Sequence, residues 1–272
     1  MDSQRRKFLK MAGLTAVAGM GAPAINMLLK GEVRASETEA STAPALPTKS
    51  VKRLGMVVDV NKFGANPGLA QKCVEACHSI HNVPDFRNPD GSIDKKDEVK
   101  WIWAEKYEHT FPDASQYKRN VGLEELPVMT FCNHCDDPPC VRACPTQATF
   151  KAKDSGIVMM DYHRCIGCRF CMAACPYGAR SFNWRDPRPF IKKLNPDFPT
   201  RMRGVVEKCT FCAERLAVGK IPACVEATGD TKAMVFGDLN DPNSEISKIL
   251  ASTFTIQRKP FLGTKPSVFY II

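Results

Sequence analysis

The chain has 272 residues, of which 44% are hydrophobic and 25% charged, so its composition is that of a globular protein rather than a disordered one. Its formal net charge is +9, of which the first 35 residues supply +4, leaving about +5 for the remainder. Nucleic-acid binding would need a clustered basic face, so this charge is not interpreted in that way. The 13 cysteines are an odd number, which argues against a framework built from disulfides alone.

The N-terminus predicts export. Residues 3–10 read S-Q-R-R-K-F-L-K, which resembles the twin-arginine signal, and small residues at 33 and 35 suggest cleavage before Ser36. The apolar stretch 11–29 contains three glycines and a proline, which makes it a poor membrane span. We therefore predict a signal peptide at 1–35 and a periplasmic protein that associates with the membrane through partner subunits. An uncleaved anchor and a basic amphipathic helix are the alternatives.

The rest of the chain predicts short elements separated by loops. Residues 36–52 are rich in Ser, Thr, Ala and Pro and are interpreted as a flexible linker. Residues 85–126 are interpreted as an insertion with a short strand or helix, and 181–205 as a loop. Strands are predicted at 55–60, 126–131 and 157–160, from 233 to a turn at Gly237 and Asp238, and at 267–272. Helices are predicted at 213–218 and 244–252.

The clearest motif is C-x2-C-x2-C-x3-C-P at 165–176. It is the bacterial ferredoxin run, in which three cysteines hold one [4Fe–4S] cluster and the fourth holds another. Gly167 relieves crowding in the loop, and Pro176 ends it. A zinc knuckle or two disulfides would be the alternatives, but four cysteines are too many for the first and too close together for the second.

Three further cysteine groups vary this motif. The run at 132–145 has a wider middle gap, and His134 inside it is interpreted as a backbone-bonded loop residue rather than a ligand. The last group has an eleven-residue gap before its third cysteine, and Thr228 stands where a fourth is expected. The first group keeps only two cysteines, with Phe63 and Ala70 in place of the others. His78 and His81 follow it and are interpreted as hydrogen-bond donors near a cluster or as surface groups.

The four groups form an internal repeat, which predicts an α+β fold of two ferredoxin-like units with interleaved cysteine runs. The first unit would comprise 53–126 and 205–272, and the second 127–204. Crossed ligation then assigns Cys132, Cys135, Cys140 and Cys175 to cluster one; Cys165, Cys168, Cys171 and Cys144 to cluster two; and Cys209, Cys212, Cys224 and Cys77 to cluster three. A fourth cluster would need cysteines at 63, 70, 73 and 228, three of which are absent. We therefore predict three [4Fe–4S] clusters and an unligated Cys73.

Phrases outside the cysteines carry a family resemblance. V-E-K-C-T-F-C at 206–212, P-A-C-V at 222–225 and F-G-D-L-N-D-P at 236–242 resemble the four-cluster ferredoxin-like electron-transfer subunits of respiratory complexes, of the polysulfide and dimethyl sulfoxide reductase type. Within that family, the leader, the degraded first run and A-C-H-S-I-H-N-V-P at 76–84 look most like the periplasmic iron–sulfur O subunit of the sulfite-reduction-associated membrane complex.

The resemblance implies a relay subunit of an oxidoreductase complex in sulfur metabolism. Its partners would be a multi-pass quinone-interacting membrane subunit and a multihaem cytochrome c, since the missing cluster is the one that molybdenum-enzyme relatives place nearest their catalytic subunit. We find no nucleophile–base set or acid–base pair, and so expect no catalytic residue and no direct small-molecule substrate. The alternatives are an electron-transfer subunit of a tetrathionate-, polysulfide- or nitrite-type reductase and, from another class, a structural zinc protein.

Overall fold

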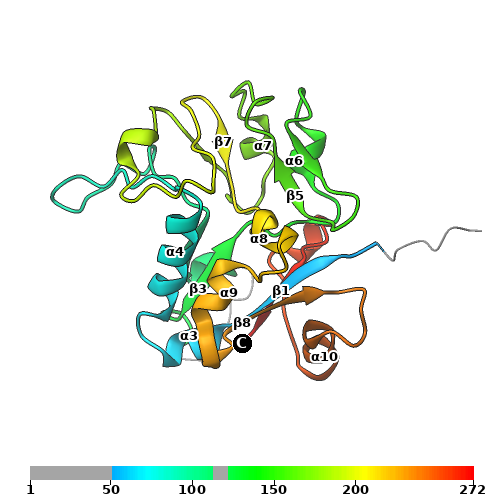
Figure 1. Cartoon of the computed structure of the whole chain (residues 1–272). Coiled ribbons are helices and arrows are strands. Elements are labelled where there is room, and N and C mark those ends of the chain that lie inside the picture. Colours follow the sequence, from blue (N-terminus) through cyan, green and yellow to red (C-terminus); the bar gives the residue numbers. More distant parts are fainter. Residues whose placement is uncertain (1–50, 113–121) are drawn as a thin grey trace, which may run out of the picture. The chain divides into compact units, whose positions relative to one another are not determined.

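This computed structural model describes residues 51–112 and 122–272 (Figure 1). The predicted signal peptide at 1–35 and nearly all of the predicted linker at 36–52 lie outside the described residues. Among the described helices, none combines the length and the apolar character needed to cross a bilayer.

Short helices and small separate sheets make up the described chain, which is compatible with the predicted α+β fold. The strands are β1 (Leu54–Asp59), β2 (Ile102–Lys106), β3 (Pro127–Phe131), β4 (Thr149–Lys151), β5 (Val158–Met160), β6 (Ser181–Phe182), β7 (Val206–Glu207), β8 (Met234–Asp238) and β9 (Val268–Ile271). The α-helices are α3 (Val60–Ala65), α4 (Leu69–Ile80), α5 (Tyr107–Thr110), α6 (Pro139–Arg142), α7 (Phe170–Ala173), α8 (Ala213–Ala217), α9 (Ala223–Thr228) and α10 (Glu245–Ser252). Three 3-10 turns, η1 (Arg188–Phe190), η2 (Gly229–Thr231) and η3 (Pro260–Leu262), complete the described elements.

A three-stranded sheet anchors the two ends of the described chain. β1 lies between β8, which is antiparallel to it, and β9, which is parallel. The four residues Gly55–Val58 are all buried, as expected for a central strand covered on both faces. Val57 packs with Ile246 of α10, whereas Met56 and Val58 belong to the main core. The C-terminal segment is therefore a strand inside the fold, as its apolar sequence predicts.

Strand and helix pairings bring distant cysteine groups together. β1 with β8, and α4 with α9, join the first cysteine group to the last. The β4–β5 hairpin joins the second group to the third, and α6 packs on α7 there. Two further pairs, β2 with β3 and β6 with β7, connect these regions to each other. Figure 1 shows α4 and α9 close together on one side of β1, with α6 and α7 at the other end of the fold.

The structure corrects three sequence predictions. Strand β8 continues through Asp238, so the turn predicted at Gly237 and Asp238 follows that residue instead. The segment 181–205 is mostly loop, as predicted, but also contains β6 and η1. The largest difference is at 60–80, where the sequence interpretation gives a degraded cysteine run without helices and the structure has α3 and α4.

Helix α4 has a sequence signal that explains its formation. Residues 69–80 contain neither glycine nor proline, and Leu69, Cys73 and Cys77 recur at a spacing of four, which places them on one face. All three are buried. Gly68, in the left-handed region with φ of 84°, sets the entry into the helix.

Candidate metal centres

The first candidate centre is a cavity, here called cavity one, of about 300 Å³. Four cysteines line it, from the loop after β3, from α6 and from the end of the third cysteine group: Cys132, Cys135, Cys140 and Cys175. Burial raises the pKa of the Cys135 thiol to about 12, and the charges of its cysteine neighbours add to that shift. A thiol whose pKa is raised in this way stays protonated unless a bound cation stabilises its thiolate.

The second candidate centre, cavity two, is a neighbouring cavity of about 260 Å³. Its cysteines are Cys144, Cys165, Cys168 and Cys171, so it takes three thiols from the third group and one from the second. Cys144, Cys165 and Cys168 are partly exposed, whereas Cys171 is buried. The pKa of Cys144 is lowered: burial opposes that shift, but the backbone N–H of Thr149 and the Thr146 hydroxyl favour the thiolate.

The third set consists of Cys77, Cys209, Cys212 and Cys224, all buried. Helix α4 supplies the first of these, the loop after β7 the next two, and α9 the last. Burial raises the pKa of Cys77 strongly, and the charges of the other three cysteines raise it further, which reflects their proximity. Cavities one and two thus each bring four cysteines together, Cys77 lies near the other three cysteines of the third set, and the thirteenth cysteine, Cys73, is fully buried in α4.

The three complete cysteine loops share a backbone feature. The residue two positions after the first cysteine has positive φ in each: 41° at His134, 70° at Gly167 and 54° at Phe211. In the last loop this turn directs the N–H of Phe211 toward sulfur, and the first residue of α9 supplies a second donor. The N–H of Phe211 donates to Cys209 Sγ at 3.4 Å, and the N–H of Ala223 donates to Cys212 Sγ at 3.4 Å. Such donors stabilise thiolate and lower its affinity for protons.

Histidine residues lie beside two of the centres without completing a set. His134 Nδ1 accepts from the N–H of Val158 at 3.1 Å, and its ring stacks on Phe211 with centroids 3.7 Å apart. It is a backbone-bonded loop residue, as the sequence predicts. His78 lies at the other face of α4 from Cys73 and Cys77.

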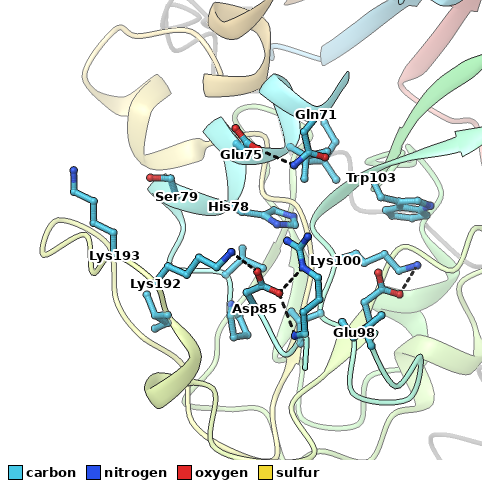
Figure 2. Close-up of a pocket in the computed structure, with 18 of the residues that line it drawn as sticks. Gln71, Glu75, His78, Ser79, Asp85, Glu98, Lys100, Trp103, Lys192 and Lys193 are labelled. Carbon is cyan, nitrogen blue, oxygen red and sulfur yellow. Dashed lines mark hydrogen bonds and ion pairs between the residues drawn. The ribbon is translucent and has the colours of Figure 1, made fainter. Parts of the chain in front are cut away.

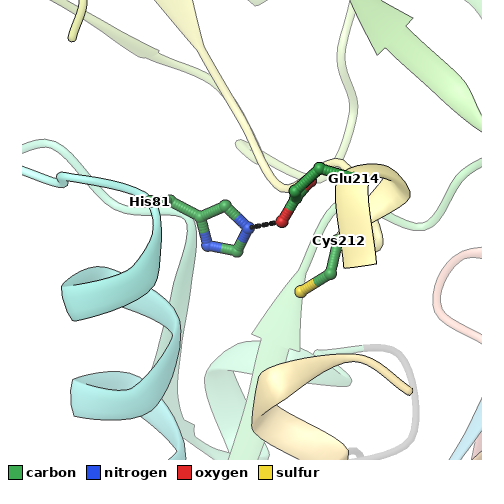
Figure 3. Close-up of side chains that lie close together, drawn as sticks. All are labelled: His81, Cys212 and Glu214. Carbon is green, nitrogen blue, oxygen red and sulfur yellow. Dashed lines mark hydrogen bonds and ion pairs between the residues drawn. The ribbon is translucent and has the colours of Figure 1, made fainter. Parts of the chain in front are cut away.

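His81 lies beside the third set, and Figure 3 shows it next to Cys212 and Glu214. Its Nε2 donates to Glu214 Oε1 at 2.9 Å, and its Nδ1 donates to the Cys77 carbonyl at 2.7 Å and lies 3.5 Å from Cys77 Sγ. Burial lowers the pKa of His81, but bonds to Cys212 and Glu214 outweigh it and raise the pKa to about 9. With both ring nitrogens donating, His81 is an imidazolium beside the cysteines.

A buried ion pair between Arg201 and Glu207 lies next to this histidine. Arg201 Nη2 lies 2.7 Å from Glu207 Oε2, and both side chains have no exposed surface. Glu207 also accepts from Trp101 Nε1 at 2.9 Å, and Trp101 stacks on His81 with centroids 4.5 Å apart. Arg201 in turn donates to the carbonyls of His81 and Asn82. The insertion that carries Trp101 is thereby bonded to the third cysteine set.

Two buried cations lie among the cysteines. Lys208 is fully buried, and Arg180 is 5% exposed. Burial lowers the pKa of Lys208, although the charges of Cys132 and Cys209 act against that shift. Burial also acts to lower the pKa of Arg180, but the cysteine charges around it prevail and raise it.

The residues at 63, 73 and 228, where a fourth cluster would need cysteines, pack within the protein. Phe63 of α3 is 1% exposed, Cys73 is fully buried, and the Thr228 hydroxyl donates to the Val225 carbonyl at 2.7 Å. Helix α4 packs directly on α9, which carries Thr228. Burial raises the pKa of Cys73 to about 11, which favours its neutral thiol.

A wider pocket, of about 1360 Å³ including the solvent at its mouth, lies along the outer face of α4 (Figure 2). Its carboxylates already have partners: Asp85 contacts Arg87 and Lys192, Glu98 contacts Lys100, and Glu75 accepts from an amide. Burial lowers the pKa of His78 in this pocket to about 4, which keeps its ring neutral. Its Nε2 is buried without a hydrogen-bond partner among the described residues, so the pocket's carboxylates are paired and its histidine is neutral.

The donor sets fit iron–sulfur clusters. All thirteen cysteines are free thiols, and eight of them line two cavities in fours, the number of ligands that holds a [4Fe–4S] cluster. Comparisons agree with this chemistry. The model of a 4Fe-4S dicluster domain matches residues 126–189.

Whole-chain relatives decide the family. The Hdr-like menaquinol oxidoreductase iron-sulfur subunit 1 of Archaeoglobus fulgidus is 41% identical over 284 residues, covering 98% of this chain and 97% of the relative. The chain belongs to the family of iron–sulfur electron-transfer subunits. Other members include a tetrathionate reductase subunit of Salmonella typhimurium, 34% identical over 100% of this chain and 89% of its own. The menaquinone reductase iron-sulfur cluster-binding subunit of Nitratidesulfovibrio vulgaris is 35% identical, and the match covers 80% of this chain and 88% of the relative.

Sequence reasoning missed the polar residues that surround the clusters of this electron-transfer subunit. Glu214 and Arg201 belong to no recognised motif, and Glu207 lies in the phrase at 206–212 without any sign of its partners. Each of the three makes a hydrogen bond to a residue more than a hundred positions away in the chain. Arg180 and Lys208 were equally invisible as cluster neighbours. A cation next to a ferredoxin cysteine run, as Lys208 is to Cys209, is the one local signal that could have drawn attention to them.

Proposed function

We propose that this subunit holds three [4Fe–4S] clusters and relays single electrons between a quinone-interacting membrane subunit and a multihaem cytochrome c. The observation that carries the proposal is the placement of twelve cysteines in three sets of four. Two sets combine cysteines of the second and third groups, and the remaining set combines the first and last groups. When bound, such clusters accept and donate one electron at a time over a wide range of potentials.

The proposed ligand sets are those of crossed ligation. Cavity one would hold cluster one, cavity two cluster two, and the third set cluster three, with Cys73 unligated. The protein's part is to hold the thiolates, exclude water and direct N–H groups toward sulfur, all of which tune potential. Two interleaved ferredoxin-like units, 53–126 with 205–272 and 127–204, account for the β1–β8 and β4–β5 pairings that support these sets.

The proposed electron path has its exposed end at cavity two. Ile166 and Phe170, on the loop and helix that carry its cysteines, are 67% and 60% exposed. Large exposed apolar side chains next to a partly exposed cluster suit a partner's approach. The third set is buried, but Val218 and Ile221 between Cys212 and Cys224 are also exposed, at 69% and 48%. These two surfaces are the proposed contact points for the two partner subunits.

The proposed partner types are supported by the relatives and by the absence of cysteines at three of the four positions that a fourth cluster would need. The names of two relatives specify menaquinol oxidoreductase and menaquinone reductase, which supports a quinone-interacting membrane partner. We propose that the chain is exported by its twin-arginine signal and works in the periplasm, in a sulfite-reduction-associated complex. A subunit of a tetrathionate-type reductase is the second candidate, favoured by the similarity over the whole chain to the Salmonella protein.

Iron analysis of anaerobically purified protein tests the cluster count. Three clusters require about 12 Fe and 12 sulfide per chain, and EPR of the reduced protein should show only four-iron signals. About 16 of each would show that a fourth cluster is bound. The argument against a molybdenum-enzyme partner would then fail.

Two cysteine variants on one helix face test the ligand assignment. Cys77→Ala should lose about four of the twelve iron atoms, because it removes a ligand of cluster three. Cys73→Ala, one helical turn away and equally buried, should keep all of them. Equal iron in the two variants, whether lost or kept, would contradict the assignment.

A further inference from the structure

Arg180 lies between cavity one and cavity two. Its side chain lines cavity one, where Cys132, Cys140 and Cys175 are its cysteine neighbours. Its Nη2 donates to Thr149 Oγ1 at 2.9 Å, and its Nη1 lies 3.9 Å from Met160 Sδ. Met160 lines cavity two, and the charge of Cys171, also in cavity two, acts on the guanidinium. A single buried cation thus contacts the surroundings of both cysteine sets.

Lys208 occupies the corresponding place between cavity one and the third set. Its ammonium donates to the Val158 carbonyl and, at 2.7 Å, to the Cys209 carbonyl. Val158 lines cavity one, and Cys209 belongs to the third set. The charges of Cys132, Cys140 and Cys209 all act on Lys208.

We propose that Arg180 and Lys208 are fixed cations that raise the reduction potential of cluster one from both sides, and that each also raises the potential of the one other cluster it adjoins. The inference rests on the proposed function, because it takes three clusters in the three sets. Arg180 would act on clusters one and two, and Lys208 on clusters one and three.

The physical reason is the charge added on reduction. Each electron makes a cluster more negative, so a nearby positive charge stabilises the reduced form more than the oxidised form. In a buried site with low effective dielectric, such an interaction is weakly screened. A cation between two clusters also reduces the repulsion that one reduced cluster exerts on its neighbour, which keeps the central position able to accept an electron.

A merely structural role would have a different signature. Each cation also satisfies buried carbonyl or hydroxyl groups, and a structural residue would affect iron retention or unfolding without a pattern in the potentials. The decisive property is therefore which clusters shift, and whether the shift follows the charge rather than the hydrogen bonds.

EPR-monitored redox titration of the full-length protein, purified anaerobically with its clusters, tests this. Arg180→Gln and Lys208→Met remove the charges with similar side-chain length. Each should lower the reduction equilibrium constant of two of the three clusters at least tenfold, which is about 59 mV for a one-electron couple. One cluster should be shifted by both variants, and the structure assigns it as cluster one.

Matched variants separate charge from position. Arg180→Lys and Lys208→Arg keep the charge and should shift the potentials less than the neutral variants do. Arg142→Gln removes a cation that is 63% exposed, two residues after Cys140, and should shift them least because solvent screens it.

Several results would overturn the proposal. Neutral variants with full iron content and wild-type potentials would do so, as would equal shifts in the neutral and charge-keeping variants. Loss of iron in the neutral variants would assign the cations to cluster assembly instead. A wild-type protein without three four-iron clusters would contradict the proposed function itself, whatever the variants do.

Discussion

Gly167 shows how a single residue permits the cysteine loop at 165–176. Its φ is 70°, and a Cβ at this position would lie 2.4 Å from the Gly204 carbonyl oxygen. Both the backbone conformation and the space therefore require glycine. The sequence motif predicts this role, but only the structure shows that the crowding comes from Gly204, far along the chain.

Gly167→Ala should destabilise the protein by more than the roughly 1–2 kcal/mol that a left-handed conformation costs a non-glycine residue, because the new methyl group also displaces Gly204. The matched control is Gly178→Ala, where φ is 64° and nothing lies within 4 Å of the added Cβ. Anaerobic thermal unfolding and iron content measure the difference. Equal losses in the two variants would show that the contact with Gly204 is unimportant.

His81 makes stability depend on pH. Its folded pKa of about 9 is above the ordinary value of 6.5, since its bonds to Cys212 and Glu214 outweigh the effect of burial. A raised histidine pKa contributes stability that is fully present below about pH 6.5 and is lost as pH rises through about 9.

The free energy of unfolding should therefore fall by roughly 1–3 kcal/mol across this window. Glu214→Gln should reduce that dependence, because the carboxylate that favours the imidazolium is gone. Glu226→Gln, which removes a 63% exposed carboxylate that pairs with Arg215 in the same region, is the control and should keep the wild-type slope. Denaturant unfolding at several pH values provides the measurement, and a wild-type slope in Glu214→Gln would contradict the assignment.

At the scale of elements, the buried Arg201–Glu207 pair joins β7 to the loop before it and to the insertion that carries Trp101. Glu207 is also bonded by Asn183, which follows β6. The pair therefore connects segments that the strand pairings alone leave separate. Arg201 also donates to the His81 carbonyl.

Arg201→Met should cost about 3–5 kcal/mol, because it leaves the Glu207 carboxylate buried without its cation. Arg188→Met removes one partner of a surface pair with Asp186, in which the side chains are 58% and 40% exposed. That variant should change stability by about 1 kcal/mol or less. Chemical denaturation of both variants is the test, and a loss in Arg201→Met no larger than in Arg188→Met would contradict the role given to the pair.

Helix α4 illustrates what element-level reading of the sequence missed. Its two cysteines suggest the remnant of a cluster loop, and that motif drew attention away from the four-residue spacing of Leu69, Cys73 and Cys77. The same spacing serves two purposes in the structure. It packs α4 on α9, and it places Cys77 in the third set.

At the scale of the whole molecule, cysteines form part of the hydrophobic core. Eight of them are buried within two groups of packed hydrophobic side chains: Cys73, Cys77, Cys132, Cys135, Cys209, Cys224, Cys140 and Cys171. The strands are two to six residues long, too short to supply a large core by themselves. The proposed iron–sulfur clusters are therefore expected to act as the centres around which the chain packs.

Iron removal should accordingly abolish cooperative unfolding, because binding energy from the metal contributes to folding. Calorimetry and near-UV circular dichroism of protein treated anaerobically with an iron chelator should show the loss of a single transition. The expectation would be contradicted by an iron-free protein that melts at the temperature of the intact one.

The sequence by itself determined the cofactor chemistry, the cysteine loops, the family and most of the strands. These depend on local spacing: cysteines two and three residues apart in one loop can reach one cluster, and apolar runs between turns form strands. Only the tertiary structure decided that α4 packs on α9, that Glu214 bonds His81, and that Arg180 and Lys208 lie between cysteine sets. Those contacts join residues from different parts of the chain, so they follow from its path in space, which no local pattern records.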